Sequence, residues 1–126
     1  MKLSGIAHAA IVVSDYEKAR DFYVNKLGFS VIQETVREAQ GDIRLDLRLG
    51  EIGLEIFALP GAPERDYAAR ICGLWHLAFQ VESVPETAKW LNSIGIETEP
   101  VRPDPANGRL LTFFRDPDGL PLEIHE

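Results

Sequence analysis

The sequence predicts an α+β fold made of two tandem βαβββ modules. One observation is a duplication, because the 68 positions that separate His8 from His76 also separate Glu55 from Glu123. Another is that each half of the chain has the pattern of a strand, a capped helix and three more strands. A third is that the duplicated polar residues alternate with apolar ones, as on one face of a sheet.

These patterns divide one predicted domain, residues 1–126, into two modules. We place module one at about 5–59, the linker at about 60–73 and module two at about 74–126. The linker contains two prolines and two glycines, which disfavour a strand. Its arginines, Arg65 and Arg70, are candidates for a lid over a site.

Module one begins with an apolar segment at 6–13, which predicts a buried strand. Ser14 and Glu17 then match the N-cap and the third helical position of a capping box. The helix should extend over 15–27 and end at a left-handed Gly28. The three remaining strands are predicted at 29–36, 43–49 and 54–59, with a hairpin turn at 39–42.

Module two repeats this order from residue 74. A strand at 74–81 precedes a second capping box, Ser83 and Glu86, and a helix that should end near Ile94 at Gly95. The capping serines are 69 positions apart, one more than the 68 that separate the duplicated strand residues, so the spacing of the helices differs slightly between the modules. The remaining strands are predicted at 96–101, 109–115 and 121–126, with a loop at 102–108 and a turn at Asp116-Pro117-Asp118-Gly119.

Strand alternation places the duplicated polar residues on one face of each sheet. With His8 on that face, Ile11 and Val13 lie on the other, where they should pack beneath the helices. The same rule directs Glu55, His76 and Glu123 away from the helices. All four should therefore point toward one concave surface.

Three further side chains should join this surface. Arg44 and Arg48 alternate with leucines in the strand at 43–49, and Phe57 lies two residues beyond Glu55. We therefore expect Arg44, Arg48 and Phe57 to contact a substrate.

The four duplicated residues predict a metal site. A single histidine could be a hydrogen-bonded structural residue, Glu55 alone could protect an edge strand, and duplication could copy a packing motif without a function. A carboxylate is nevertheless costly to bury unless it is paired or bound to metal, and here two carboxylates converge with two imidazoles. His8, Glu55, His76 and Glu123 thus predict one divalent ion, and these donors suit Ni²⁺, Co²⁺, Zn²⁺ or Mn²⁺.

Composition narrows the class of partner. The net charge of −7, from 13 basic and 20 acidic side chains, argues against a nucleic-acid partner. No apolar run is long enough to span a membrane, and we see no secretory signal. The single Cys72 is compatible with a reducing compartment. We therefore expect a cytoplasmic protein that binds a small molecule.

The two βαβββ modules, their four polar positions and the Asp-Pro-Asp-Gly turn resemble the vicinal oxygen chelate superfamily over essentially the whole chain. The glyoxalase I-like (lactoylglutathione lyase-like) branch is the most similar. This resemblance implies a curved, cup-shaped mixed sheet with helices on the outside, around one divalent metal. It implies that the ligands come from the first and fourth strands of each module, and that the protein is a homodimer whose site forms within a chain or across the dimer. The ligand positions correspond to His8, Glu55, His76 and Glu123.

The resemblance also implies an activity. Such a lyase or isomerase moves a proton between adjacent carbons of a substrate chelated through neighbouring oxygens, with Glu123 or Glu55 as the base. Many glyoxalases have an arginine four residues after the first histidine, where it helps bind the glutathione carboxylate, and Val12 stands there in this chain. The alternatives are an epimerase of an α-hydroxy or α-keto compound, and a binding protein that sequesters a small molecule, as drug-resistance relatives do.

Other residues receive structural interpretations. We expect Trp75 to pack rather than to contact substrate, and His125 to lie at the rim of the site. Phe113 or Phe114 should line an apolar pocket, and a bulge would decide which of them does so.

Overall fold

The computed structural model describes residues 2–126 and divides into two compact units, Met1–Glu64 and Arg65–Glu126. Each unit contains one four-stranded mixed sheet and helical structure, which confirms the predicted α+β class. In both units, hydrogen bonding pairs the first strand in parallel with the last.

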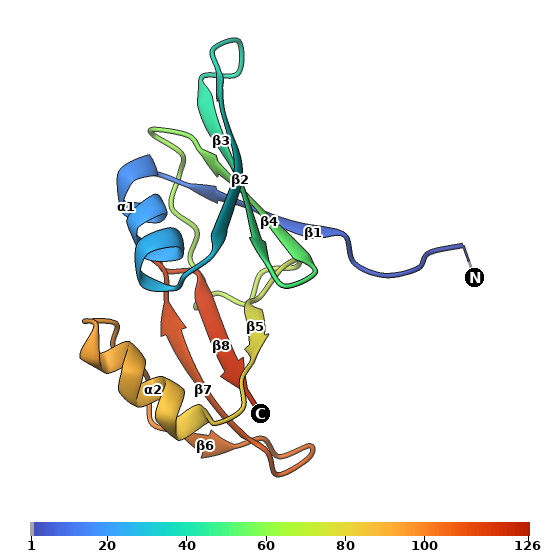
Figure 1. Ribbon diagram of the computed structural model, residues 1–126, viewed down its shortest axis with the longest axis vertical. Helices are drawn as coiled ribbons and strands as arrows, with labels where there is room; N and C mark the ends of the chain where they lie inside the picture. The colour runs from blue at the N-terminus through green and yellow to red at the C-terminus, as the bar shows by residue number, and fades with distance from the viewer. Residues whose placement is uncertain (1) are drawn as a thin grey trace. The chain divides into compact units, whose positions relative to one another are not determined.

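Unit 1 has the sheet order β1-β4-β3-β2 (Figure 1). Strands β1 and β4 are parallel, and the other neighbours are antiparallel. Its elements are β1 His8–Val13, α1 Tyr16–Arg20, η1 Asp21–Lys26, β2 Ser30–Arg37, β3 Asp42–Leu49 and β4 Ile52–Ala58.

The predicted faces of this sheet are confirmed. Val13, Leu45 and Ile56 are at most 1% exposed, whereas Glu55 and Phe57, on the alternate positions of β4, are only partly buried. The apolar face therefore supplies the core of unit 1, and the polar face is left for other contacts.

The first helix begins one residue later than predicted. Its N-cap is Asp15, whose side chain accepts a hydrogen bond from the Lys18 amide at 3.0 Å, so the expectation that Ser14 is the cap is wrong. Both residue types cap well, and the extended backbone of Asp15 decides between them.

The second half of this helix, η1, is a π-helix. Its wider turn closes with the Leu27 amide donating to the carbonyl of Phe22 at 2.9 Å. Tyr23 in this turn is fully buried and meets the ring of Phe29 edge to face. Gly28 follows with a φ of 83°, the predicted left-handed end.

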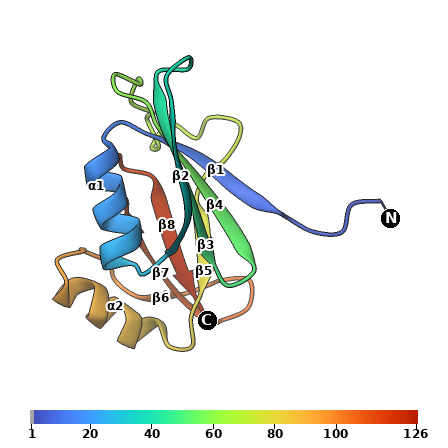
Figure 2. The same cartoon turned by 45° about the horizontal axis from the view of Figure 1, so that its top comes forward.

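Unit 2 has the sheet order β5-β8-β7-β6. Helix α2 lies against β7 (Figure 2). The predicted second N-cap is confirmed, because the Ser83 side chain accepts from the Glu86 amide. Its elements are β5 Leu77–Gln80, α2 Val84–Ser93, β6 Arg102–Pro103, β7 Leu110–Arg115 and β8 Pro121–His125.

Two strand predictions in this unit are wrong in extent. Residues 96–101 form no strand. They contribute one backbone hydrogen bond to β7, from the Glu99 amide to the Phe113 carbonyl, and the strand that pairs with this edge of β7 is the short β6. Pro100 has no amide to donate, and the Asn92 side chain holds Thr98 back toward α2. Strand β5 starts at Leu77, so His76 lies immediately before it.

Within residues 2–126, no helix is long and apolar enough to cross a membrane.

Candidate functional site

The polar face of unit 1 brings His8 and Glu55 together. The β1–β4 register pairs His8 with Gly53 and Ala10 with Glu55, which places the two side chains diagonally across neighbouring strands. His8 Nε2 lies 3.3 Å from Glu55 Oε2. The imidazole is about half exposed and the carboxylate largely buried, so the pair is open on the side of His8.

Gly53 leaves room for this histidine. A Cβ added at Gly53 would lie 3.3 Å from the Cβ of His8, closer than side chains normally approach. The backbone of Gly53 does not adopt a positive φ, so the requirement for glycine here is spatial.

Arg44, one of the predicted substrate contacts, is paired with two carboxylates of unit 1, Asp46 and Glu55. Its guanidinium donates to the Asp46 carboxylate at 3.0–3.1 Å and lies 3.4 Å from Glu55. The bond to Asp46 raises the pKa of Arg44. Arg44 and Arg37 both lie over the ring of Phe57, and Arg48 is exposed opposite Gly53. Arg44 therefore acts as a neighbour of Glu55 within the polar face.

Unit 2 repeats the His–Glu arrangement. Strand β8 pairs Ala78 with Glu123, matching the pairing of Ala10 with Glu55 in unit 1. His76 Nε2 lies 4.0 Å from Glu123 Oε1, and the imidazole meets the ring of Phe113 edge to face at 5.1 Å. The expected register is thus present in both units.

Glu123 is the more enclosed of the two carboxylates. Its side chain is 12% exposed, compared with 17% for Glu55, and it faces His76 beyond hydrogen-bonding distance. No group among residues 2–126 donates a hydrogen bond to the Glu123 carboxylate. Its oxygens are therefore left to interact with water or with a bound cation.

Each unit therefore presents one imidazole and one carboxylate. Over the part of the chain that the structure describes, no group of three or more His, Cys, Asp or Glu side chains is gathered to hold a metal ion. A single His–Glu pair supplies two donors, fewer than the four or more protein and water ligands that divalent transition metals take.

A pocket of about 300 Å³ opens beside His76, entirely within unit 2. Phe113, not Phe114, faces it, because Phe113 pairs with Glu123 across the sheet while Phe114 is buried behind. The prediction that Trp75 is a packing residue is wrong, since it is 57% exposed and lines this pocket. The lining is Tyr67, Trp75, His76, Glu99, Arg102, Phe113, Arg115 and Pro121.

Sequence reasoning missed several of these lining residues. Arg115 stands two residues beyond Phe113 in β7, so alternation from Glu123 would have found it. Arg102 gave no such signal, because the segment before it does not continue as a strand.

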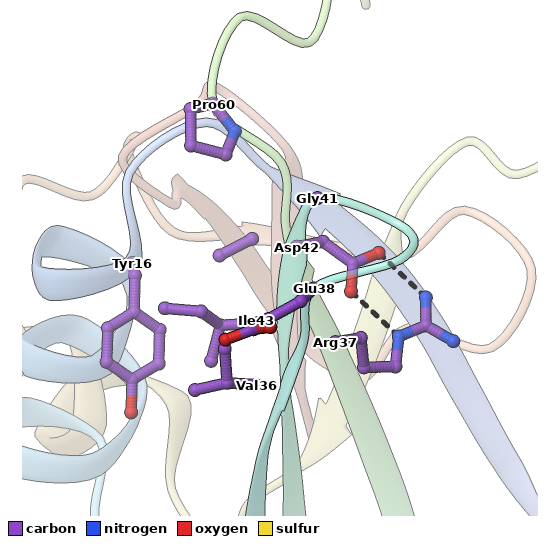
Figure 3. A pocket seen from close by; sticks show the side chains of 9 residues that line it. Tyr16, Val36, Arg37, Glu38, Gly41, Asp42, Ile43 and Pro60 are labelled. Atoms are coloured by element: carbon purple, nitrogen blue, oxygen red, sulfur yellow. Dashed lines mark hydrogen bonds and ion pairs between the residues drawn. The ribbon is translucent and has the colours of Figure 1, made fainter.

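A second pocket, of about 240 Å³, lies in unit 1 and contains no predicted site residue. Figure 3 shows Tyr16 facing Val36 and Ile43, with the paired Arg37 and Asp42 on the other side of the strands. Arg37 binds Asp42 through two hydrogen bonds of 2.7 Å, which lower the pKa of Asp42. This pocket is an apolar gap beside the β2–β3 hairpin.

Two other polar features of unit 2 have structural roles. The Asp116 side chain accepts from the amides of Asp118 and Leu120, which shapes the Asp-Pro-Asp-Gly turn before β8. His125 is paired with Asp104 at 3.0 Å, and this bond raises the pKa of His125. His125 thus ties β8 to the loop after β6.

The chain matches a known family over most of its length. The model of the glyoxalase/bleomycin resistance protein/dioxygenase superfamily matches residues 5–124. The chain therefore belongs to this superfamily, which includes enzymes.

Within the superfamily, the chain has near relatives in several bacteria. It is 53% identical to the uncharacterized protein YwkD of Bacillus subtilis, covering 100% of this chain and 99% of the relative. It is 41% identical to the uncharacterized protein YaeR of Escherichia coli, covering 98% and 97%. A solved glyoxalase family protein from Enterococcus faecalis has a TM-score of 0.96 at 50% identity, with both chains fully covered.

A more distant similarity shows the fold alone. The glyoxalase I of Leishmania major matches with a TM-score of 0.74 at 21% identity, covering 98% of this chain and 87% of that one.

Proposed function

We propose that this protein is a divalent-metal-dependent lyase or isomerase of the glyoxalase I type, which moves a proton between adjacent carbons of a substrate bound through neighbouring oxygens. The observation that carries the proposal is the repeated His–Glu arrangement, with separations of 3.3 Å in unit 1 and 4.0 Å in unit 2. Imidazole and carboxylate donors of this kind suit a borderline divalent ion.

The donor set fits such an ion. Glu123 is enclosed and accepts no hydrogen bond from residues 2–126, and a bound cation would offset the cost of burying its charge. We propose His8, Glu55, His76 and Glu123 as the ligands of one Ni²⁺, Co²⁺, Zn²⁺ or Mn²⁺ ion. The two pairs would come from a single chain or from two chains of a homodimer.

The two carboxylates receive different roles. A bound ion would stabilise, as a Lewis acid, the negative charge that develops on the oxygens of the substrate. Glu55 is restrained by Arg44 at 3.4 Å, so we assign it as a fixed ligand. No arginine or lysine among residues 2–126 is paired with Glu123, so we assign it as the base that takes and returns the substrate proton. His8 and His76 serve as anchors.

The test is the Glu123→Gln variant, assayed with the methylglyoxal–glutathione hemithioacetal after loading with Ni²⁺, Co²⁺ or Zn²⁺. Glutamine keeps the size of the side chain but cannot accept the proton, so kcat/KM should fall at least about hundredfold. Bound metal, measured by elemental analysis, should be largely retained. Turnover equal to that of the wild type would refute the role of Glu123.

Glu55→Gln is the matched control. It should weaken metal binding more than Glu123→Gln does, and turnover should recover at saturating metal. If the wild-type protein binds metal but does not turn over the hemithioacetal, an epimerase or another isomerase becomes the better assignment, in keeping with Val12 at the glutathione position. A protein that binds no metal would instead be assigned to ligand sequestration.

A further inference from the structure

The pocket beside His76 has aromatic walls. Tyr67, Trp75 and Phe113 line it, and Phe113 lies edge-on to the imidazole. Burial and the nearby charge of Asp116 raise the pKa of Tyr67, which keeps its hydroxyl neutral. Its ring lies next to Gly119 of the Asp-Pro-Asp-Gly turn. The walls therefore suit a flat, apolar body placed close to a proposed metal ligand.

Arginines surround these aromatic walls. Arg102 lies over Phe113 at 5.4 Å, Arg65 over Tyr67 at 5.4 Å and Arg70 over Trp75 at 5.6 Å. Arg102 and Arg115 also line the pocket themselves. Residues 65–126 carry six basic and ten acidic side chains, so positive charge is concentrated here in a unit that is acidic as a whole. The concentration of arginine indicates an anionic ligand.

Glu99 forms an ion pair with each of the two lining arginines. Its backbone is held against β7 by the amide bond to Phe113 and by the Thr112 hydroxyl, which donates to the Glu99 carbonyl at 2.7 Å. Its carboxylate lies 3.6 Å from Arg102 and 3.9 Å from Arg115, and all three side chains are about half exposed. Such long, exposed pairs are weak, so the guanidiniums keep donors for a second carboxylate.

We propose that this pocket binds the carboxylate of a small aromatic or similarly flat α-hydroxy or α-keto acid, with Arg102 and Arg115 as its specificity determinants. The body of the acid stacks among Tyr67, Trp75 and Phe113, and its α-oxygen is directed toward His76. The assignment of this ligand as the substrate class rests on the proposed function.

The pocket carries its own reporter. The chain has two tryptophans, Trp75 in the lining and Trp90 on α2, so a Trp90→Phe background, excited where tyrosine does not absorb, leaves Trp75 as the single tryptophan reporter. Titrations use metal-free protein, prepared with a chelator, and compare mandelate with its neutral counterpart mandelamide. Mandelate should quench Trp75 with a Kd at least about tenfold lower than that of mandelamide, because charge-assisted bonds are lost with the amide.

Substitutions of the arginines and of Glu99 should act in opposite directions. Arg102→Gln and Arg115→Gln should each weaken mandelate binding about tenfold, whereas Glu99→Gln should strengthen it several-fold by removing a competing carboxylate. Arg109→Gln, an exposed arginine of the same unit outside the lining, is the matched control and should leave the Kd unchanged. Circular dichroism melting checks that each variant is folded.

The results separate this inference from the proposed function. Equal binding of mandelate and mandelamide, absence of binding, or an equal loss in Arg109→Gln would overturn the pocket assignment, even if metal and turnover are found. Arginine-dependent mandelate binding in a protein that takes no metal would support the pocket as an anion site and overturn its role as the site of an isomerase.

Discussion

Glu55 and Glu123 hold equivalent positions in their sheets but have different neighbours. Glu55 lies near both His8 and Arg44, whereas Glu123 lies near His76 and opposite Phe113. A carboxylate held by a guanidinium is a more fixed ligand than one facing an aromatic ring. This difference is the basis for assigning proton transfer to Glu123.

A substitution at Gly53 tests whether the position of His8 matters for metal binding. Gly53→Ala adds a Cβ at 3.3 Å from that of His8, so the imidazole must shift away from its present position. We expect metal affinity, measured by calorimetry, to fall about tenfold, as for changes in groups that orient a ligand. Circular dichroism melting checks that the variant is folded, because the close contact with His8 opposes the gain from restricting the unfolded chain. Unchanged metal affinity would contradict the placement of His8 as a ligand.

The side-chain directions of His8, Glu55 and Glu123 could be predicted because they follow from alternation in strands, whereas His76 lies just before β5. Ala10 with Glu55 and Ala78 with Glu123 occupy the same register, as the duplication required. Trp75 could not be predicted in this way. It precedes β5, where no strand period applies, and it is exposed in the pocket that Tyr67 also lines.

At the scale of elements, α1 is tied to β2 by its first residue. The Tyr16 hydroxyl donates a hydrogen bond to Glu34, and desolvation followed by this bond raises the pKa of Tyr16 from 10.0 to about 12. The bond requires a protonated phenol. A group whose pKa is raised on folding stabilises the protein fully below its unfolded pKa and loses that effect as the pH rises through the folded value.

The resulting prediction concerns alkaline pH. Tyr16→Phe should reduce the free energy of unfolding by about 1 kcal/mol near neutral pH, and the difference from the wild type should shrink between pH 10 and 12. Urea unfolding at several pH values measures it, with ultraviolet titration of tyrosinate in both proteins as the direct check. A constant difference up to pH 12 would contradict the assigned bond.

The helix caps show where the sequence alone is ambiguous. Ser14 and Asp15 are both good N-caps, and Glu17 favoured the wrong one. The correct cap was available from the duplication, since Asp15 and Ser83 are 68 positions apart, like the two histidines. The segment at 96–101 was misassigned because its composition resembles a strand, while Pro100 and the bonds from Asn92 prevent pairing.

For the whole molecule, the duplication is the organising feature. Each unit repeats a parallel first and last strand with antiparallel neighbours, and each presents one histidine beside one glutamate. Two donors from one unit are too few for a divalent site, so we propose that function requires both. A metal that depends on both units would explain why the strand positions of the repeat kept their register.

Metal binding by single-histidine variants tests this claim most directly. Titration calorimetry of chelator-treated protein with Ni²⁺ should give one ion per chain in the wild type. His8→Ala and His76→Ala should each lower the affinity at least about hundredfold, although they change different units. His125→Gln, which alters the third histidine and its bond to Asp104, is the control and should bind as the wild type does. Wild-type affinity in either alanine variant, or no binding by the wild type, would contradict the account.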